Sequence, residues 1–341
     1  MHNNSNYIHL QDRTALANVN MSHFNQTIFL ILVCVFSAVC FTGCAPGEGD
    51  SSRYDASGSS AQNVPLKQPL QVVATYSILA DWVQKIGGER VALTVLVGAG
   101  GDAHTYEPTP QDSVALEKAD LLFENGLAFE VWLDGLFDAS NSDARRVVVS
   151  KAIKPRELVV SESRTEIDPH VWHLPENARI MVESITSALE KADPHNASEY
   201  RKRQSDYVVQ LNELDKWISQ QTASIPESRR KLVTTHDTFG YLADKYGFEV
   251  ISVLGSVSSE TADPSAGQVA EVIKRISDLK LPAIFAENIL NPKLTQKIAD
   301  ESGVKIVPTL YTDALGSTTS PASDYLKMMR FNVKTICESL R

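Results

Sequence analysis

The sequence predicts an α/β fold with two lobes, each built on a parallel sheet, and one long helix between them. Short β-branched segments alternate with amphipathic segments from about residue 70, and the same alternation restarts after residue 230. Such alternation is typical of parallel strands joined by crossover helices. The chain has 341 residues, more than a single hydrophobic core usually organises. Two lobes follow from these observations together.

The first lobe is expected over residues 70–191. Its strand candidates are QVVATY, VALTVLV, DLLFEN and RVVVS, and its helix candidates are SILADWVQKIGG, TPQDSVALEKA and FEVWLDGLF. Each strand candidate but the last is followed by a helix candidate, which predicts a parallel sheet covered by helices.

A long helix is expected between the lobes, within residues 192–226. The stretch 196–222 is polar overall and contains neither Gly nor Pro. Its apolar residues recur at helical spacing and are Tyr200, Tyr207, Leu211, Leu214 and Ile218. At 1.5 Å per residue such a helix would be about 40 Å long, the scale of a whole domain. We therefore expect it to bridge the two lobes.

The second lobe is expected over residues 227–341. Its strand candidates are KLVTTH, FEVISVL, PAIFAE and VKIVPTL. TFGYLADKY is a helix candidate that Gly247 closes, because glycine readily takes the left-handed C-cap conformation. Asp263 and Pro264 are expected to start the next helix, and Asn291 and Pro292 the one after, which ends at Gly303.

The N-terminal segment predicts an export signal. Residues 28–43 are apolar and uncharged, too short for a membrane span of about 20 residues but suited to the core of a signal peptide. The ending Phe-Thr-Gly-Cys resembles a bacterial lipobox, so we expect residues 1–44 to be a signal segment and Cys44 to carry lipid. Plain cleavage or an uncleaved anchor is the alternative. Met21 competes with Met1 as the start, and residues 45–69 are expected to be a flexible tether.

The net charge argues against one class of partner, and the cysteine content argues against intrachain disulfides. The net charge of −10 argues against nucleic acid, because phosphate binding needs clustered Lys and Arg. Of the four cysteines only Cys337 lies outside the signal segment and the lipid site, so no intrachain disulfide is expected in the mature form.

Three histidines lie in strongly marked contexts. His104 lies in GDAHTYEP, His170 in DPHVWH and His236 in TTHDTFGY, and 66 positions separate each from the next. This spacing is unlike close-spaced zinc motifs, so only the fold could assemble a shared site. His104 and Asp313 follow strand candidates and His236 ends one, and ligand groups gather beyond the carboxyl ends of parallel strands. Spacing alone leaves the site open, because polar residues are common at strand ends.

Five motifs together resemble one known family. GDAHTYEPTP, DPHVWHLPENA, TTHDTFGYLADKYG, FAENILNPKL and YTDALG occur in the order found in the metal-binding solute receptors of ABC transporters, the zinc and manganese lipoproteins that include adhesin-named members. The resemblance covers about residues 70–341. It implies two lobes joined by a rigid helix, with one metal ion at their interface held by His104, His170, His236 and Asp313. It also implies delivery of that ion to an ABC permease, and no enzymatic activity.

The ligand set implied by this resemblance favours zinc. Three imidazoles and one carboxylate suit Zn²⁺, whereas Mn²⁺ prefers more oxygen, and manganese-type members often have Glu at the position of His236. The chain lacks the His-rich and acidic loop of many zinc-specific members, so manganese, or iron, is the alternative. We expect a monomer, anchored through Cys44 on the periplasmic or cell-surface side.

Other residues and other functions offer alternatives to this interpretation. His173 is an alternative ligand, although a supporting role is expected. Asp237 and Glu287 are expected to orient imidazoles, with helix capping or a buried hydrogen bond as the alternative. A zinc hydrolase would keep a coordination position open for water, which four protein ligands would fill. An adhesin would need a partner-binding patch that the sequence does not reveal.

Overall fold

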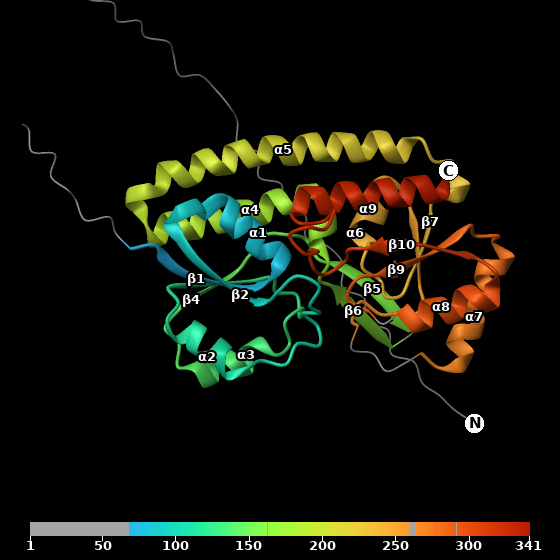
Figure 1. Cartoon of the computed structure of the whole chain (residues 1–341), viewed down its shortest axis with the longest axis horizontal. Coiled ribbons are helices and arrows are strands. Elements are labelled where there is room, and N and C mark those ends of the chain that lie inside the picture. Colours follow the sequence, from blue (N-terminus) through green and yellow to red (C-terminus); the bar gives the residue numbers. More distant parts are fainter. Residues whose placement is uncertain (1–67, 162, 260–263, 291) are drawn as a thin grey trace, which may run out of the picture. The chain divides into compact units, whose positions relative to one another are not determined.

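A computed structural model describes residues 68–161, 163–259, 264–290 and 292–341 (Figure 1). The expected signal segment, Cys44 and nearly all of the tether lie outside the described residues. The described residues all belong to one compact unit. Among the described residues, no helix has the length and apolar character needed to cross a membrane.

The first lobe is built on a four-stranded parallel sheet, as predicted. Its strands are β1 (Leu70–Tyr76), β2 (Val91–Val97), β3 (Leu121–Glu124) and β4 (Arg145–Val148), in the order β2-β1-β3-β4. The helices between them are α1 (Ser77–Gly87), α2 (Pro110–Glu117) and α3 (Leu133–Ser140). Central β1 is buried along almost its whole length, which explains why its sequence is nearly continuous in apolar residues.

The second lobe contains two pairs of parallel strands. β7 (Lys231–Thr234) pairs with β8 (Glu249–Ser252), and β9 (Ala283–Glu287) pairs with β10 (Lys305–Leu310). β7 and β9 lie side by side, so the four strands form one layer. The helices are α6 (Gly240–Tyr246), α7 (Ala266–Asp278), α8 (Pro292–Ser302) and, near the C-terminus, α9 (Tyr325–Leu340). Gly247 ends α6 with φ of 74°, the left-handed conformation that was expected.

The start expected for α7 is wrong. Asp263 lies outside the described residues, and the helix begins after Ser265. The Ser265 hydroxyl accepts a hydrogen bond from the backbone N–H of Gln268, while the Gln268 side chain accepts one from the backbone N–H of Ser265. This capping box satisfies two backbone donors at once, which a Pro264 start would not do.

The long helix is present as α5 (Ala197–Ala223), which has 27 residues. The five apolar residues predicted to form its inner face are all buried: Tyr200, Tyr207, Leu211, Leu214 and Ile218. α5 packs on α4 (Pro175–Ala192), on α1 of the first lobe and on α9 of the second, and it runs alongside both lobes (Figure 1). The largest cluster of buried apolar side chains includes residues from both lobes and from this helix layer. The exact lobe boundaries at 191/192 and 226/227 stay a prediction.

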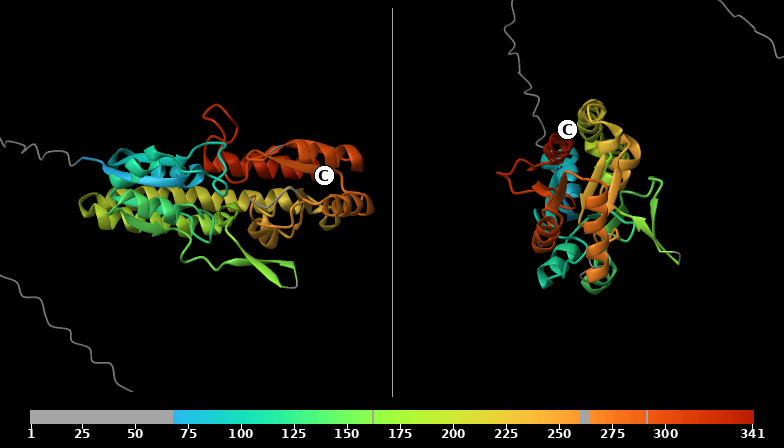
Figure 2. Two further views of the ribbon diagram at one scale, coloured as in Figure 1. Left: turned by 90° about the horizontal axis from the view of Figure 1, so that it is seen from below. Right: turned by 90° about the vertical axis from the view of Figure 1, so that its right-hand side faces the viewer.

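A hairpin that the sequence did not reveal precedes α4. β5 (Arg156–Ser161) and β6 (Arg164–Asp168) are antiparallel and project from the body of the molecule (Figure 2). Five of their eleven residues are charged, and the only apolar run is the three residues 158–160, which is shorter than the run of a typical buried strand. The hairpin positions the site because β6 leads directly into His170.

Candidate metal centre

The four residues proposed from the sequence meet in one buried cluster. His104 lies in the loop after β2, His170 just before a 3-10 turn (Val171–His173), His236 two residues after β7, and Asp313 after β10. His104 is 3% exposed and the other three side chains are fully buried. One ligand atom from each residue lies within 4.8 Å of all the others. His104, His236 and Asp313 thus lie beyond the carboxyl ends of parallel strands, as the carboxyl-end rule predicts, whereas His170 follows the antiparallel strand β6.

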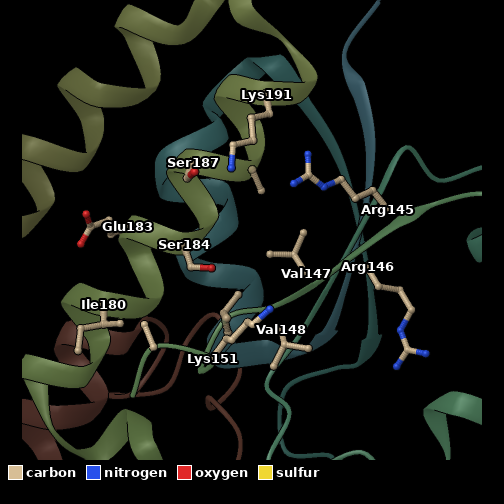
Figure 3. A pocket seen from close by; sticks show the side chains of 13 residues that line it. Arg145, Arg146, Val147, Val148, Lys151, Ile180, Glu183, Ser184, Ser187 and Lys191 are labelled. Carbon is tan, nitrogen blue, oxygen red and sulfur yellow. The ribbon is translucent and has the colours of Figure 1, made fainter. Parts of the chain in front are cut away.

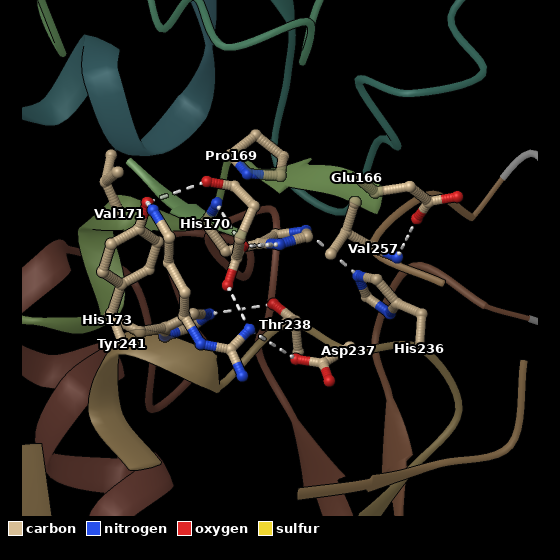
Figure 4. A network of polar contacts seen from close by, with 12 residues as sticks. Glu166, Pro169, His170, Val171, His173, His236, Asp237, Thr238, Tyr241 and Val257 are labelled. Carbon is tan, nitrogen blue, oxygen red and sulfur yellow. Dashed lines mark hydrogen bonds and ion pairs between the residues drawn. The ribbon is translucent and has the colours of Figure 1, made fainter. Parts of the chain in front are cut away.

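The atoms that face one another are the Nε2 atoms of the three imidazoles and the two oxygens of Asp313. The Nε2 atom of His170 is 3.3 Å from that of His104 and 3.3 Å from that of His236. Asp313 Oδ2 is 3.2 Å from Nε2 of His236 and 3.5 Å from Nε2 of His104, and Asp313 Oδ1 is 3.6 Å from Nε2 of His170. Figure 4 shows His170 and His236 pointing at each other from different segments.

His170 is held from behind by a carboxylate of its own segment. Its Nδ1 lies 2.8 Å from Asp168 Oδ1, which also accepts a hydrogen bond from the His170 backbone N–H. Arg156 donates from Nη1 to Asp168 Oδ2 at 3.2 Å. Because Nδ1 donates to this carboxylate, Nε2, which faces the cluster, is the nitrogen whose lone pair would bind a metal ion once its proton is displaced.

His236 is held by Glu287, as the sequence analysis proposed. Glu287 ends β9 beside β7, and its Oε2 lies 2.5 Å from His236 Nδ1. Glu287 Oε1 accepts hydrogen bonds from the backbone N–H groups of Thr235 and His236, at 2.6 Å and 3.1 Å. Oδ1 of Asp237, the other candidate, lies instead 3.5 Å from Arg156 Nη1, and among the described residues no hydrogen bond or ion pair joins Asp237 to an imidazole of the cluster.

Asp313 is supported by Thr238 and, through it, by His173. Thr238 Oγ1 donates to Asp313 Oδ1 at 3.3 Å and lies 3.2 Å from His173 Nε2. His173 is fully buried and does not belong to the group of ligand atoms. The structure therefore gives His173 the supporting place that the sequence analysis expected.

His104 differs from the other two imidazoles in how its ring is held. Its backbone N–H donates to Asp102 Oδ1 at 2.9 Å, and its ring packs edge-on against Phe129. Within the described part of the chain, no carboxylate or carbonyl contacts its Nδ1. A cavity of about 430 Å³ adjoins it and is lined by Leu127, Val131 and Ile167, among others. His104 thus forms the side of the cluster nearest to solvent.

The electrostatics of the cluster favour positive charge at two of its imidazoles. Burial opposes charge on His170, but the carboxylates of Asp313 and Asp168 outweigh it and raise its pKa to about 9. Burial likewise opposes charge on His236, yet Glu287 and Asp313 raise its pKa well above the usual value. Burial alone dominates at His104 and lowers its pKa to about 3. The carboxylates that favour a proton on His170 and His236 would also attract a divalent cation bound at these imidazoles.

Asp313 is ionised despite its burial. Burial would raise the pKa of this carboxyl, but His236 and His170 hold it well below its usual range. The cluster therefore presents a negative oxygen together with three imidazole nitrogens, which is a set of donors suited to a transition metal.

Sequence reasoning missed Asp168, Arg156 and Thr238. Asp168 could have been found, since the motif Asp-Pro-His places a carboxylate two residues before a candidate ligand. Arg156 lies on the unpredicted hairpin, and Thr238 contacts His173 and Asp313 only through the fold. No local pattern marks either of these two residues.

A larger cavity lies away from the cluster. It has a volume of about 770 Å³, lies between β4 and α4, and is lined by Arg145, Arg146, Lys151 and Lys191 (Figure 3). None of the four candidate ligands lines it. Its basic lining does not suit a metal cation.

The two-lobe fold and the buried His and Asp cluster define the chain as a metal-binding solute receptor. A family model described as "Zinc-uptake complex component A periplasmic" matches residues 72–339. The chain belongs to this family, whose members are the metal-binding, substrate-binding components of ABC transporters and not enzymes.

Relatives within the family are named for different metals. The chain is 36% identical over 271 residues to "Manganese-binding lipoprotein MntA" of Halalkalibacterium halodurans, covering 80% of this chain and 88% of the relative. It is 30% identical to "Iron-binding protein YfeA" of Yersinia pestis, covering 91% and 96%. The periplasmic zinc binding protein TroA from Treponema pallidum superposes with a TM-score of 0.75 at 34% identity, over 80% of this chain and 99% of that one.

Proposed function

We propose that this protein captures Zn²⁺ outside the cytoplasm and delivers it to an ABC permease, with His104, His170, His236 and Asp313 as the four ligands. The observation that carries the proposal is the convergence of three imidazole nitrogens and one ionised carboxylate in a single buried cluster. Nitrogen-rich donor sets suit Zn²⁺, and Zn²⁺ lies above Mn²⁺ in the affinity order of divalent ions.

The spacing of the ligand atoms supports four-coordinate zinc. Zn²⁺ binds imidazole nitrogen at about 2.0–2.1 Å, and the edge of a tetrahedron is about 1.6 times the bond length, so neighbouring ligands should be about 3.3 Å apart. The two distances between imidazole nitrogens are 3.3 Å, and those from Asp313 Oδ2 to Nε2 of His236 and His104 are 3.2 Å and 3.5 Å. All four ligand atoms lie within 4.8 Å of one another, so small movements of the side chains would bring the remaining separations to tetrahedral values.

The enclosure of the cluster supports capture over catalysis. Each candidate ligand is at most 3% exposed, and four protein ligands complete a tetrahedral shell. A catalytic zinc needs a position for water and a general base beside it. The carboxylates behind the cluster, Asp168 and Glu287, contact the Nδ1 atoms of two imidazoles instead, where they orient the rings.

Manganese is the second candidate, and one observation favours it. Both oxygens of Asp313 face imidazoles of the cluster, so this carboxylate could supply a second oxygen to an ion that prefers more of them. The relatives named as manganese-binding lipoproteins agree with this possibility.

Attachment to the membrane is part of the proposal. We propose that lipid on Cys44 anchors the protein and that residues 45–69 tether the receptor within reach of its permease. Several relatives are named lipoproteins, which supports the lipobox interpretation. We expect the receptor to act as a monomer.

The test is the metal content of protein purified without added metal, followed by competitive titration of Zn²⁺ and Mn²⁺. We expect one zinc ion per chain and tighter binding of Zn²⁺. His236→Glu replaces one nitrogen with oxygen and should lower the ratio of zinc to manganese affinity by roughly tenfold or more. Manganese content in the wild type, with an unchanged ratio in the variant, would overturn the choice of zinc. The absence of any bound metal would overturn the function itself.

A further inference from the structure

Thr238 contacts both Asp313, a candidate ligand, and His173 behind it. It lies in the turn between β7 and α6, two residues after His236, and its side chain is fully buried. Its hydroxyl lies between two buried groups, Asp313 Oδ1 at 3.3 Å and His173 Nε2 at 3.2 Å. Figure 4 shows the contact between Thr238 and His173.

The number of available protons decides the direction of these contacts. A threonine hydroxyl has one hydrogen to donate, and a carboxylate can only accept. Both contacts are hydrogen bonds only if Thr238 donates to Asp313 and His173 donates from Nε2 to Thr238. His173 thus directs the hydroxyl hydrogen of Thr238 at Oδ1 of Asp313.

The two oxygens of Asp313 are therefore unequal. Oδ1 accepts from Thr238, whereas Oδ2 accepts no hydrogen bond from a described residue and lies 3.2 Å from Nε2 of His236. His170 is close to Oδ1, but its Nε2 carries no hydrogen once it binds a metal. Thr238 is then the remaining donor to Oδ1 in the described part of the cluster.

We infer that Thr238 sets the coordination number of the metal, and through it the preference for zinc over manganese, by keeping Asp313 a ligand through Oδ2 alone. This inference rests on the proposed function. With one oxygen the shell has four ligands, which suits Zn²⁺. With both oxygens it would have five ligands and a larger share of oxygen, which suits Mn²⁺ better. His173 is a positioning residue that acts through Thr238.

The test compares Thr238→Val, which has nearly the same shape without the hydroxyl, with Thr238→Ser, which keeps the donor. Co²⁺ replaces the metal, because its visible absorption is intense in four-coordinate sites and weaker in five-coordinate ones. We expect a four-coordinate spectrum for the wild type and for Thr238→Ser, and a five-coordinate spectrum for Thr238→Val. The ratio of zinc to manganese affinity should fall in Thr238→Val only, because a fifth, oxygen ligand favours Mn²⁺.

A second variant tests the chain of hydrogen bonds. His173→Phe keeps an aromatic ring against Phe239, which the His173 ring contacts at 4.4 Å between centroids, but removes the donor to Thr238. We expect a shift of the Co²⁺ spectrum in the same direction as for Thr238→Val. If Thr238→Val does not fold, Thr238→Ala removes the same hydroxyl and serves the same comparison.

The outcomes separate this inference from the proposed function. A four-coordinate spectrum and an unchanged affinity ratio in Thr238→Val would overturn the inference and leave metal capture intact. A five-coordinate spectrum in the wild type would also overturn it, because Thr238 would then not restrain Asp313. A wild type that binds neither Zn²⁺ nor Co²⁺ would refute the proposed function.

Discussion

Glu287→Gln is the sharpest test of how the cluster holds His236. Glu287 contacts His236 Nδ1 through Oε2 and two backbone N–H groups through Oε1. Glutamine has the same shape but only one accepting oxygen and an amide that donates. If its oxygen keeps the two backbone hydrogen bonds, its amide faces Nδ1. The reverse orientation would set the amide against two backbone donors, so the first is favoured.

The consequence is a change of tautomer at His236. An amide donor facing Nδ1 requires that nitrogen to accept, so the ring proton moves to Nε2, where it blocks the metal. Loss of an outer partner typically costs 10–100-fold in metal affinity, and with tenfold equal to about 1.4 kcal/mol this is about 1.4–2.8 kcal/mol. We expect Glu287→Gln to reach the upper part of this range because it adds the tautomer penalty to the lost charge.

The assay is competitive titration of Zn²⁺ against a coloured chelator. Glu124→Gln is a matched control, because Glu124 also ends a buried parallel strand but contacts Arg146 instead of an imidazole. Its metal affinity should stay at the wild-type value. A folded Glu287→Gln protein that binds Zn²⁺ within about threefold of the wild type would refute the reasoning, since an outer partner of a ligand should matter more than that.

Three further predictions follow from the site and the fold. His104 lines a cavity of about 430 Å³, through which free imidazole could reach the space left by His104→Ala and restore Zn²⁺ binding. The side chain of His236 is fully buried, so free imidazole should not restore binding to His236→Ala. The pKa of His170 is raised to about 9 and that of His236 well above its usual value, so in the absence of metal both imidazoles carry an extra proton at pH 7.5. Zn²⁺ should therefore displace about two protons when it binds, and its affinity should fall as the pH falls. Leu211→Ala should lower the free energy of unfolding by about 2–5 kcal/mol, because this side chain is fully buried on the inner face of α5.

Each of these has a measurement that can contradict it. Rescue by imidazole is followed with the same chelator titration, and equal rescue of both alanine variants would contradict the access route at His104. Proton release is measured by calorimetry in buffers of different ionisation enthalpy. Release of well under one proton would mean that His170 and His236 titrate near the reference pKa of about 6.5. For Leu211→Ala, urea unfolding is compared with Val209→Ala, whose side chain is 54% exposed and should cost under about 0.5 kcal/mol.

The sequence by itself determined the elements whose signals are local. The inner face of α5 could be predicted residue by residue because the burial of a helix face follows a period of 3.6. Gly247 ended α6 as expected because few other residues take a positive φ without strain. The start of α7 was misplaced because two capping signals lie within three residues of each other, and the reciprocal hydrogen bonds of Ser265 and Gln268 prevail.

Only the tertiary structure decided how the site is assembled. His104, His170 and His236 are 66 positions apart, so their meeting depends on how the lobes pack and not on any local period. The motif resemblance named four side chains that the structure brings together in one buried cluster, but it carried no distances. The contact of Thr238 with both His173 and Asp313 joins three segments of the chain. Such contacts leave no trace in sequence spacing, because they arise from the packing of whole elements.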